Sequence, residues 1–126
     1  MRILLIAVAV LAHAGSARAD DDIERAKKHF EVAELHFAEG EFSEAIAQYR
    51  KAHALSNEPL LLFNVGLCFE KLGKRDDAIA SYRAYLAAAA DGSKAGEARY
   101  RLAKLESEAG KPAVTERPKA TPAPPW

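Results

Sequence analysis

The side chains best suited to chemistry are two histidines, a single cysteine and several carboxylates. His29 and His36 are seven positions apart, which places both near one face of a helix. A catalytic or metal site needs further donors at short spacing, such as the HExxH pattern, and no such pattern joins these histidines. Glu34, Glu41 and Glu44 are typical of a solvated helix exterior. We therefore expect packed or surface histidines, no catalytic residue, no bound metal and no cofactor.

Cys68 is the single cysteine of the chain, so neither an intrachain disulfide nor a cysteine-based zinc site can form. It lies between Leu67 and Phe69, in an apolar stretch where a free cysteine packs like a small hydrophobic residue. Two interpretations stay open: a buried inert thiol, which we favour, and an intermolecular disulfide formed after export. A redox or metal-binding protein that uses Cys68 or the histidines is the third function class to test.

Helices must position these side chains, because apolar residues recur at spacings of three and four from about residue 22 to residue 110. No stretch alternates with a period of two, so we expect no strands. The first helix is predicted to begin near Ile23, with Asp21 and Glu24 as a capping pair, and to end at Gly40. Four further helices are expected over about 43–55, from Pro59 to Gly73, over 76–90 and over 93–109. This pattern predicts an all-α domain over residues 20–110.

One stretch of the sequence occurs twice in similar form. GEFSEAIAQYRKA, at residues 40–52, returns at residues 73–85 as GKRDDAIASYRAY, with six of thirteen positions identical. The pairing extends to small and aromatic positions on both helices of each copy: Ala33 with Gly66, His36 with Phe69, Gly40 with Gly73, Ala45 with Ala78, and Tyr49 with Tyr82. The pattern resembles the tetratricopeptide repeat (TPR), a helix–turn–helix unit of about 34 residues. This resemblance implies a short right-handed solenoid with repeats at about 26–58 and 59–92 and a capping helix at 93–109.

TPR resemblance implies binding of a protein or peptide on the concave surface that the first helices of the repeats form. The family's groove positions fall on Lys27, Phe30, Glu34, Phe37, Leu60, Phe63, Asn64, Leu67 and Glu70, and in the last helix on Tyr100, Arg101 and Lys104. Asn64 matches an asparagine of TPRs that clamp a terminal carboxylate, but Phe30 replaces the basic residue of that clamp. A groove with these phenylalanines suits an amphipathic helix or an extended chain.

The bulk composition indicates one ordinary globular domain. The 126 residues are 49% apolar and 29% charged, and 18 acidic residues balance 18 basic ones. Charges of both signs are interspersed, so the sequence lacks the clustered basic residues that are typical of a nucleic-acid-binding protein.

The N-terminal segment, 1–19, has the order of a secretory signal peptide: the base Arg2, an apolar run over 3–14, and Ala17-Arg18-Ala19. We expect cleavage after Ala19, so that the mature chain begins at Asp20 in the periplasm or outside the cell. The apolar run is short against the roughly 20 residues of a membrane span. An uncleaved signal anchor is the alternative, and it would be the chain's contact with a membrane.

At the other end, five of the six prolines lie in residues 111–126, which predicts a disordered proline-rich tail. Its PxxP at 122–125 fits a spacer better than a ligand motif.

Together these features predict a periplasmic or cell-envelope interaction module that binds a peptide or helix of a partner whose identity the sequence does not reveal. The alternative is an accessory factor in envelope assembly, of the type associated with the Tol–Pal system. Because stacked repeats gain stability from their neighbours and about three are usually needed, two repeats predict a marginal domain. We expect a partner or a homodimer to stabilise it.

Overall fold

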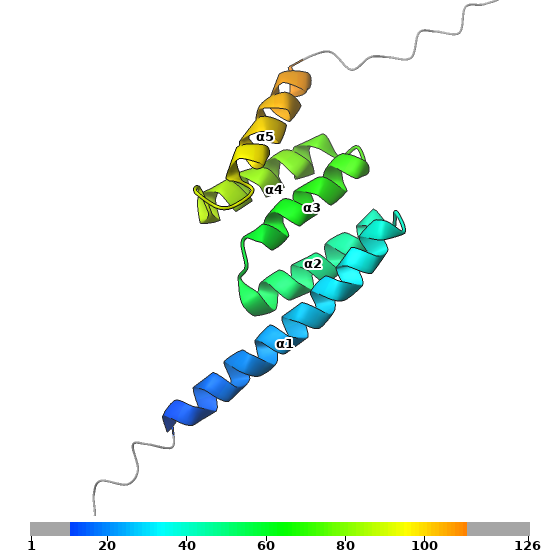
Figure 1. Ribbon diagram of the computed structural model, residues 1–126. Helices are drawn as coiled ribbons and strands as arrows, with labels where there is room; N and C mark the ends of the chain where they lie inside the picture. The colour runs from blue at the N-terminus through cyan, green and yellow to red at the C-terminus, as the bar shows by residue number, and fades with distance from the viewer. Residues whose placement is uncertain (1–10, 111–126) are drawn as a thin grey trace, which may run out of the picture.

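The computed structural model describes residues 11–110. In this range all regular secondary structure is helical, and there is no strand. The helices are α1 (Leu11–Ala38), α2 (Phe42–Ser56), α3 (Leu60–Lys71), α4 (Arg75–Ala88) and α5 (Ala95–Ala109). Figure 1 shows two helical hairpins stacked on each other, with α5 leaning against the second. The predicted all-α, TPR-like helical solenoid is confirmed. The proline-rich tail and the first ten residues lie outside the described range.

Each hairpin turns at a glycine whose backbone is left-handed. Gly40 has φ +78° and Gly73 has φ +71°, a region that glycine enters without steric cost. The two turns carry the same hydrogen bonds: Glu41 N–H donates to the His36 carbonyl at 2.8 Å, and Lys74 N–H donates to the Phe69 carbonyl at 2.9 Å. The repeated stretch of sequence therefore encodes one turn twice.

Small residues let the helices of each pair approach closely. Ala33 of α1 and Ala45 of α2 are fully buried at the first contact. At the second, a β-carbon added to Gly66 would lie 2.6 Å from the Tyr82 ring, closer than real contacts allow. The expectation of small residues at matched positions is thus confirmed, and each buried tyrosine fills the space beside them.

The start of α1 differs from the sequence expectation. The helix continues without a break through Asp21 and Glu24, so these residues cap nothing. Asp22 instead forms an ion pair with Arg25 one turn later, at 3.1 Å. The physical reason is that residues 11–22 contain no proline and several alanines, so nothing stops the helix from extending backwards.

Ala19 and Asp20 are exposed residues within α1, and cleavage between them stays a prediction. Within residues 11–110, we find no helix with the length and apolar character that a membrane crossing would require.

The last helix closes the stack as expected. Ala95, Ala98 and Leu105 are buried, while Leu102 is half-buried against the core. The helix begins slightly later than predicted, at Ala95. The N–H of Lys94, the residue before it, donates to the hydroxyl of Tyr85 in α4 at 3.0 Å.

Candidate functional site

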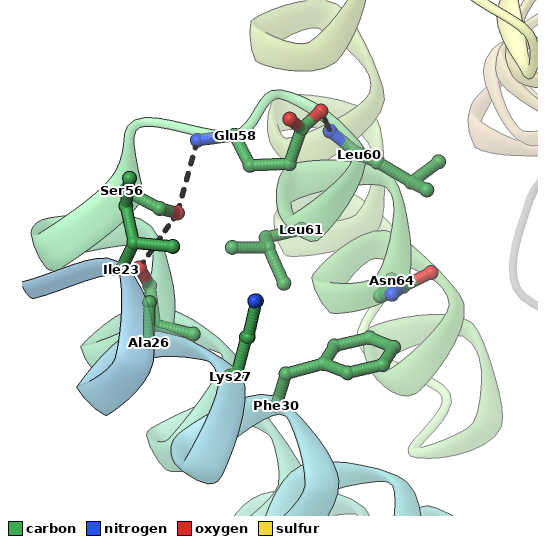
Figure 2. Close-up of a pocket in the computed structure, with 10 residues that line it drawn as sticks. Ile23, Ala26, Lys27, Phe30, Ser56, Glu58, Leu60, Leu61 and Asn64 are labelled. Atoms are coloured by element: carbon green, nitrogen blue, oxygen red, sulfur yellow. Dashed lines mark hydrogen bonds between the residues drawn. The ribbon is translucent and has the colours of Figure 1, made fainter. Parts of the chain in front are cut away.

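An open pocket of about 340 Å³ lies where the start of α3 faces the middle of α1. Its walls are almost entirely apolar, and they come from three helices and one loop: Ile23, Ala26, Lys27, Phe30, Ala52, Ser56, Glu58, Leu60, Leu61 and Asn64. In Figure 2 the Phe30 ring, the Leu61 side chain and the Lys27 chain converge from facing helices. The volume is at the lower end of the range of about 300–1,000 Å³ that ligand pockets occupy.

Helical spacing explains the long wall of the pocket. Ile23, Ala26 and Phe30 follow one another at intervals of three and four, so one stripe of α1 faces the cavity. Ile23 is 48% exposed and Phe30 is 37% exposed, because no helix covers this part of the stripe. The result is an apolar surface that is accessible from solvent.

The loop between α2 and α3 holds the closed end of the pocket. Ser56 Oγ donates to the Ala52 carbonyl at 2.9 Å and accepts from Glu58 N–H at 3.2 Å. Glu58 Oε1 then accepts from Leu60 N–H at 3.4 Å, at the first residue of α3. Asn57 takes the left-handed conformation, with φ 53°, and lets the chain reverse. These bonds order the loop that connects α2 to α3.

Four of the predicted groove residues meet in this pocket: Lys27, Phe30, Leu60 and Asn64. The first two come from α1 and the other two from α3, so the pocket spans two repeats. In Figure 2 the Lys27 side chain points between Phe30 and Leu61, and Asn64 lies on α3 beside the Phe30 ring.

The two remaining α1 positions lie further along the helix. Glu34 accepts a hydrogen bond from the Tyr49 hydroxyl of α2. Burial, followed by this carboxylate, raises the pKa of Tyr49 above its usual range. Phe37 is half-buried and packs edge-on against Phe42, with ring centroids 5.3 Å apart, beside the hairpin turn. Both residues support the first hairpin and are partly accessible.

Glu70 and Arg101 are brought together as an ion pair that links α3 to α5, with Arg101 Nη1 2.7 Å from Glu70 Oε2. The same carboxylate accepts from the Tyr82 hydroxyl at 2.7 Å, and Arg101 Nε also donates to Glu97 at 3.0 Å. Burial alone would lower the pKa of Arg101, but its bonds to Glu97 and Glu70 raise it. Lys94 and Arg101 in turn hold the pKa of Glu97 below its usual value. This network attaches the capping helix to the second repeat.

Phe63 does not lie in a groove. Only 2% of it is exposed, and its ring packs against Tyr82 at 5.5 Å and Tyr85 at 5.7 Å between centroids. The expectation that Phe63 contacts a partner is therefore wrong, because the large side chain of Tyr85 draws it into the core. Leu67 is half-buried against that core, whereas Tyr100 and Lys104 of α5 are exposed to solvent.

Cys68 is fully buried and forms no disulfide in the structure. Burial, followed by the negative charge of Glu34, raises the pKa of its thiol to about 11. A disulfide with a second chain needs an accessible sulfur, which this position does not offer. The structure therefore supports the buried, inert thiol.

Sequence reasoning missed the six other pocket residues: Ile23, Ala26, Ala52, Ser56, Glu58 and Leu61. The periodicity of the first helix already places Ile23 and Ala26 on one face, which is a usable signal. Ser56 and Glu58 belong to a loop, whereas the projected groove positions come from the first helices alone. Their place in the wall follows from the packing of α3 on α2.

Residues 61–91 match the family model described as tetratricopeptide repeat. This segment runs from α3 through the Gly73 turn and includes all of α4, so it covers the second hairpin. A comparison with curated proteins finds no match to the chain. Proteins with such repeats are typically non-enzymatic scaffolds that bind other proteins. Residues 61–91 are thus similar to a tetratricopeptide repeat. Together with the helical solenoid, this match supports a TPR-family protein and, in general, a protein–protein interaction module.

Proposed function

We propose that the protein is an exported interaction module that binds a peptide or a helix of a protein partner in the pocket between α1 and α3. The observation that carries the proposal is the pocket itself: an apolar cavity of about 340 Å³ that opens to solvent and spans two repeats. An exposed apolar hollow of this kind is costly in water and usually marks a binding surface.

The shape and chemistry of the pocket favour a partner with a bulky apolar side chain. Phe30 and Leu61 offer apolar walls, and Ile23 extends the apolar stripe towards the N-terminus. The Lys27 ammonium can donate to a carbonyl or carboxylate of the partner, and the Asn64 amide can both donate and accept. A polypeptide backbone carries both hydrogen-bond donors and acceptors. It can therefore pair with Lys27 and Asn64, which a purely apolar molecule cannot do.

The test begins with a peptide display library screened against the full chain, followed by affinity measurements on the selected peptides. Phe30→Ala should weaken binding by about tenfold or more, since buried aromatic anchors carry most of an interface's energy. Asn64→Ala should cost less, because rim contacts are worth less. Val32→Ser is the matched control, as Val32 is an exposed apolar residue of the same helix that does not line the pocket.

Two outcomes would contradict the proposal. One is a set of selected peptides whose affinity is unchanged by Phe30→Ala while both proteins melt alike. The other is an equal loss of affinity in Val32→Ser, which would move the binding surface away from the pocket.

Export is part of the same proposal and rests on the signal-like order of the N-terminal segment, 1–19. Expression in a secreting bacterium should give a mature chain whose mass corresponds to a start at Asp20. A retained Met1 in the membrane fraction would support the uncleaved anchor instead.

A further inference from the structure

The turn between α1 and α2 gathers three side chains that are common metal ligands. His36 Nδ1 and carboxylate oxygens of Glu39 and Glu41 all lie within 4.8 Å of one another. The closest pair is His36 Nδ1 and Glu41 Oε2, at 2.5 Å. The three residues lie within six consecutive positions, His36 to Glu41, where α1 ends, and the turn brings Glu41 back beside His36.

Backbone hydrogen bonds hold this turn at three consecutive residues, Glu39, Gly40 and Glu41. Glu39 N–H donates to the Leu35 carbonyl at 3.1 Å, and Gly40 N–H donates to the Phe37 carbonyl at 3.1 Å. Glu41 N–H closes the turn on the His36 carbonyl at 2.8 Å. The three donors are therefore attached to a rigid frame, which lowers the entropy lost when they converge on an ion.

Within the described residues, the two carboxylates of this turn have one ion-pair partner between them, His36. Across residues 11–110, no lysine or arginine forms an ion pair with Glu39 or Glu41, and Glu41 has His36 as its ion-pair partner. In the described part of the chain the Glu39 carboxylate is thus not occupied by a basic side chain, and the partner of Glu41 is itself a common metal ligand.

The second repeat shows that the donors are not a requirement of the turn. At the matched positions of the second turn stand Phe69, Leu72 and Lys74, none of which can ligate a metal at neutral pH. Both turns nevertheless have the same glycine conformation and the same hydrogen bonds. Folding alone therefore does not account for a histidine and two glutamates in the first turn.

We propose that His36, Glu39 and Glu41 bind one divalent transition-metal ion, with Zn²⁺ as the best fit. An imidazole nitrogen with two carboxylate oxygens suits Zn²⁺, whereas Ca²⁺ and Mg²⁺ prefer oxygen ligands alone. Bonds of about 2.0–2.2 Å set neighbouring tetrahedral ligands about 3.4 Å apart. The His36–Glu41 contact must therefore open slightly and Glu39 must approach, which their partly exposed side chains permit.

Such an ion would join the end of α1 to Glu41, the residue that precedes α2. It would stabilise the first hairpin at the end remote from the pocket, whose α1 wall runs only from Ile23 to Phe30. Three protein ligands leave a fourth position for water or for a donor from a partner. The proposal does not depend on the peptide-binding function.

The test is a titration of the full-length, tag-free chain with Zn²⁺ against a chromophoric chelator. We expect one ion per chain with micromolar affinity, and a melting midpoint that rises when Zn²⁺ is added. His36→Phe and Glu41→Lys, which install the residues of the second turn, should each weaken the affinity at least tenfold. His29→Gln is the matched control and should bind as tightly as the parent, since His29 contacts Gln48 and not the turn.

Glu39→Gln provides a variant that keeps the exposed turn residue nearly isosteric, in case the other two variants unfold. It too should weaken the affinity at least tenfold. In NMR spectra, Zn²⁺ should shift the His36 ring signals and leave those of His29 and His53 in place. The proposal would be overturned by an absence of binding at millimolar Zn²⁺, or by affinity that survives both His36→Phe and Glu39→Gln.

Discussion

The two hairpins share one plan, yet the same positions are buried to different extents. Val32 and Leu35 of α1 are 39% and 64% exposed, whereas the matched Val65 and Cys68 of α3 are 4% and 0% exposed. α3 packs against both α2 and α4, while α1 packs chiefly against α2. The comparison teaches that burial in a stacked repeat depends on its neighbours as much as on its own sequence.

A second difference concerns the tyrosine of each hairpin. The Tyr49 hydroxyl bonds to Glu34, but the Tyr82 hydroxyl bonds to Glu70, whose matched residue in the first repeat is Phe37. The two rings therefore meet the small position of the first helix differently. Ala33 has room for its β-carbon, whereas Gly66 has none beside the Tyr82 ring.

Exchanging the small residues Gly66 and Ala33 between the two repeats should have the largest effect on the free energy of unfolding. Gly66→Ala places a β-carbon 2.6 Å from the ring of Tyr82, which is fully buried and cannot retreat. We expect the free energy of unfolding to fall by about 2 kcal/mol, the usual cost of overpacking a core. Urea denaturation of the variant and the parent measures the difference.

The reverse exchange, Ala33→Gly, is the control. It introduces no clash and should cost about 1 kcal/mol through lost helix propensity. Propensity alone predicts the opposite sign for Gly66→Ala, a gain of about 1 kcal/mol. A stabilised Gly66→Ala variant would show that the Tyr82 ring is free to move and that the two repeats pack alike.

We expect the thiol of Cys68 to cause a loss of stability in alkali. Leu35, the matched residue of the first repeat, does not ionise and cannot cause such a loss. Its pKa rises from 9.0 to about 11 on folding, so the folded chain holds the proton more tightly than the unfolded chain. The resulting stabilisation is complete below pH 9 and is lost as the pH rises through 11. Between pH 7 and pH 10 the loss should be about 1.4 kcal/mol.

The measurement compares urea melts of the parent and of Cys68→Ala at both pH values. Raised pKa values of Tyr49 and Tyr82 act in the same direction, and both proteins retain them. The parent should therefore lose more stability than the variant, by the amount that the thiol contributes. Equal losses would mean that the thiol is already accessible to solvent in the folded chain.

Much of the fold could be predicted because the signals are local. Ala45 and Tyr49, which the repeated stretch places at small and aromatic positions, are both buried in α2. Gly40 and Gly73 mark the turns because a left-handed backbone position favours glycine wherever it occurs. Periodicity and turn residues depend on near neighbours in the chain, which a sequence displays directly.

The remaining features depend on packing between elements. Helix position alone assigns Phe63 to the groove, but the direction of its ring is decided by Tyr85 of α4. Leu72 lies three residues after the buried Phe69, yet it follows the last turn of α3, and 36% of it is exposed. The loop wall of the pocket also arises from tertiary contacts. Such contacts leave no periodic trace.

The smallest effect is expected at the exposed outer face of α1. Leu35→Ala should change the free energy of unfolding by less than about 0.5 kcal/mol in dilute protein, since surface substitutions rarely cost more. Val65→Ala at the buried counterpart of Val32 should cost clearly more, because it opens a cavity between repeats. Thermal melts of both variants and the parent give the comparison.

Repeating these melts over a hundredfold range of protein concentration tests the predicted homodimer. If a second copy covers the outer face of α1, the parent's midpoint rises with concentration, by mass action. Leu35→Ala should then become destabilising only at the concentrated end, where that face is buried. A midpoint independent of concentration, with a monomer in sedimentation at every loading, would end the homodimer prediction. The exposed Leu35 and Val32 would then be the uncovered end of the stack, and stabilisation would have to come from a different protein.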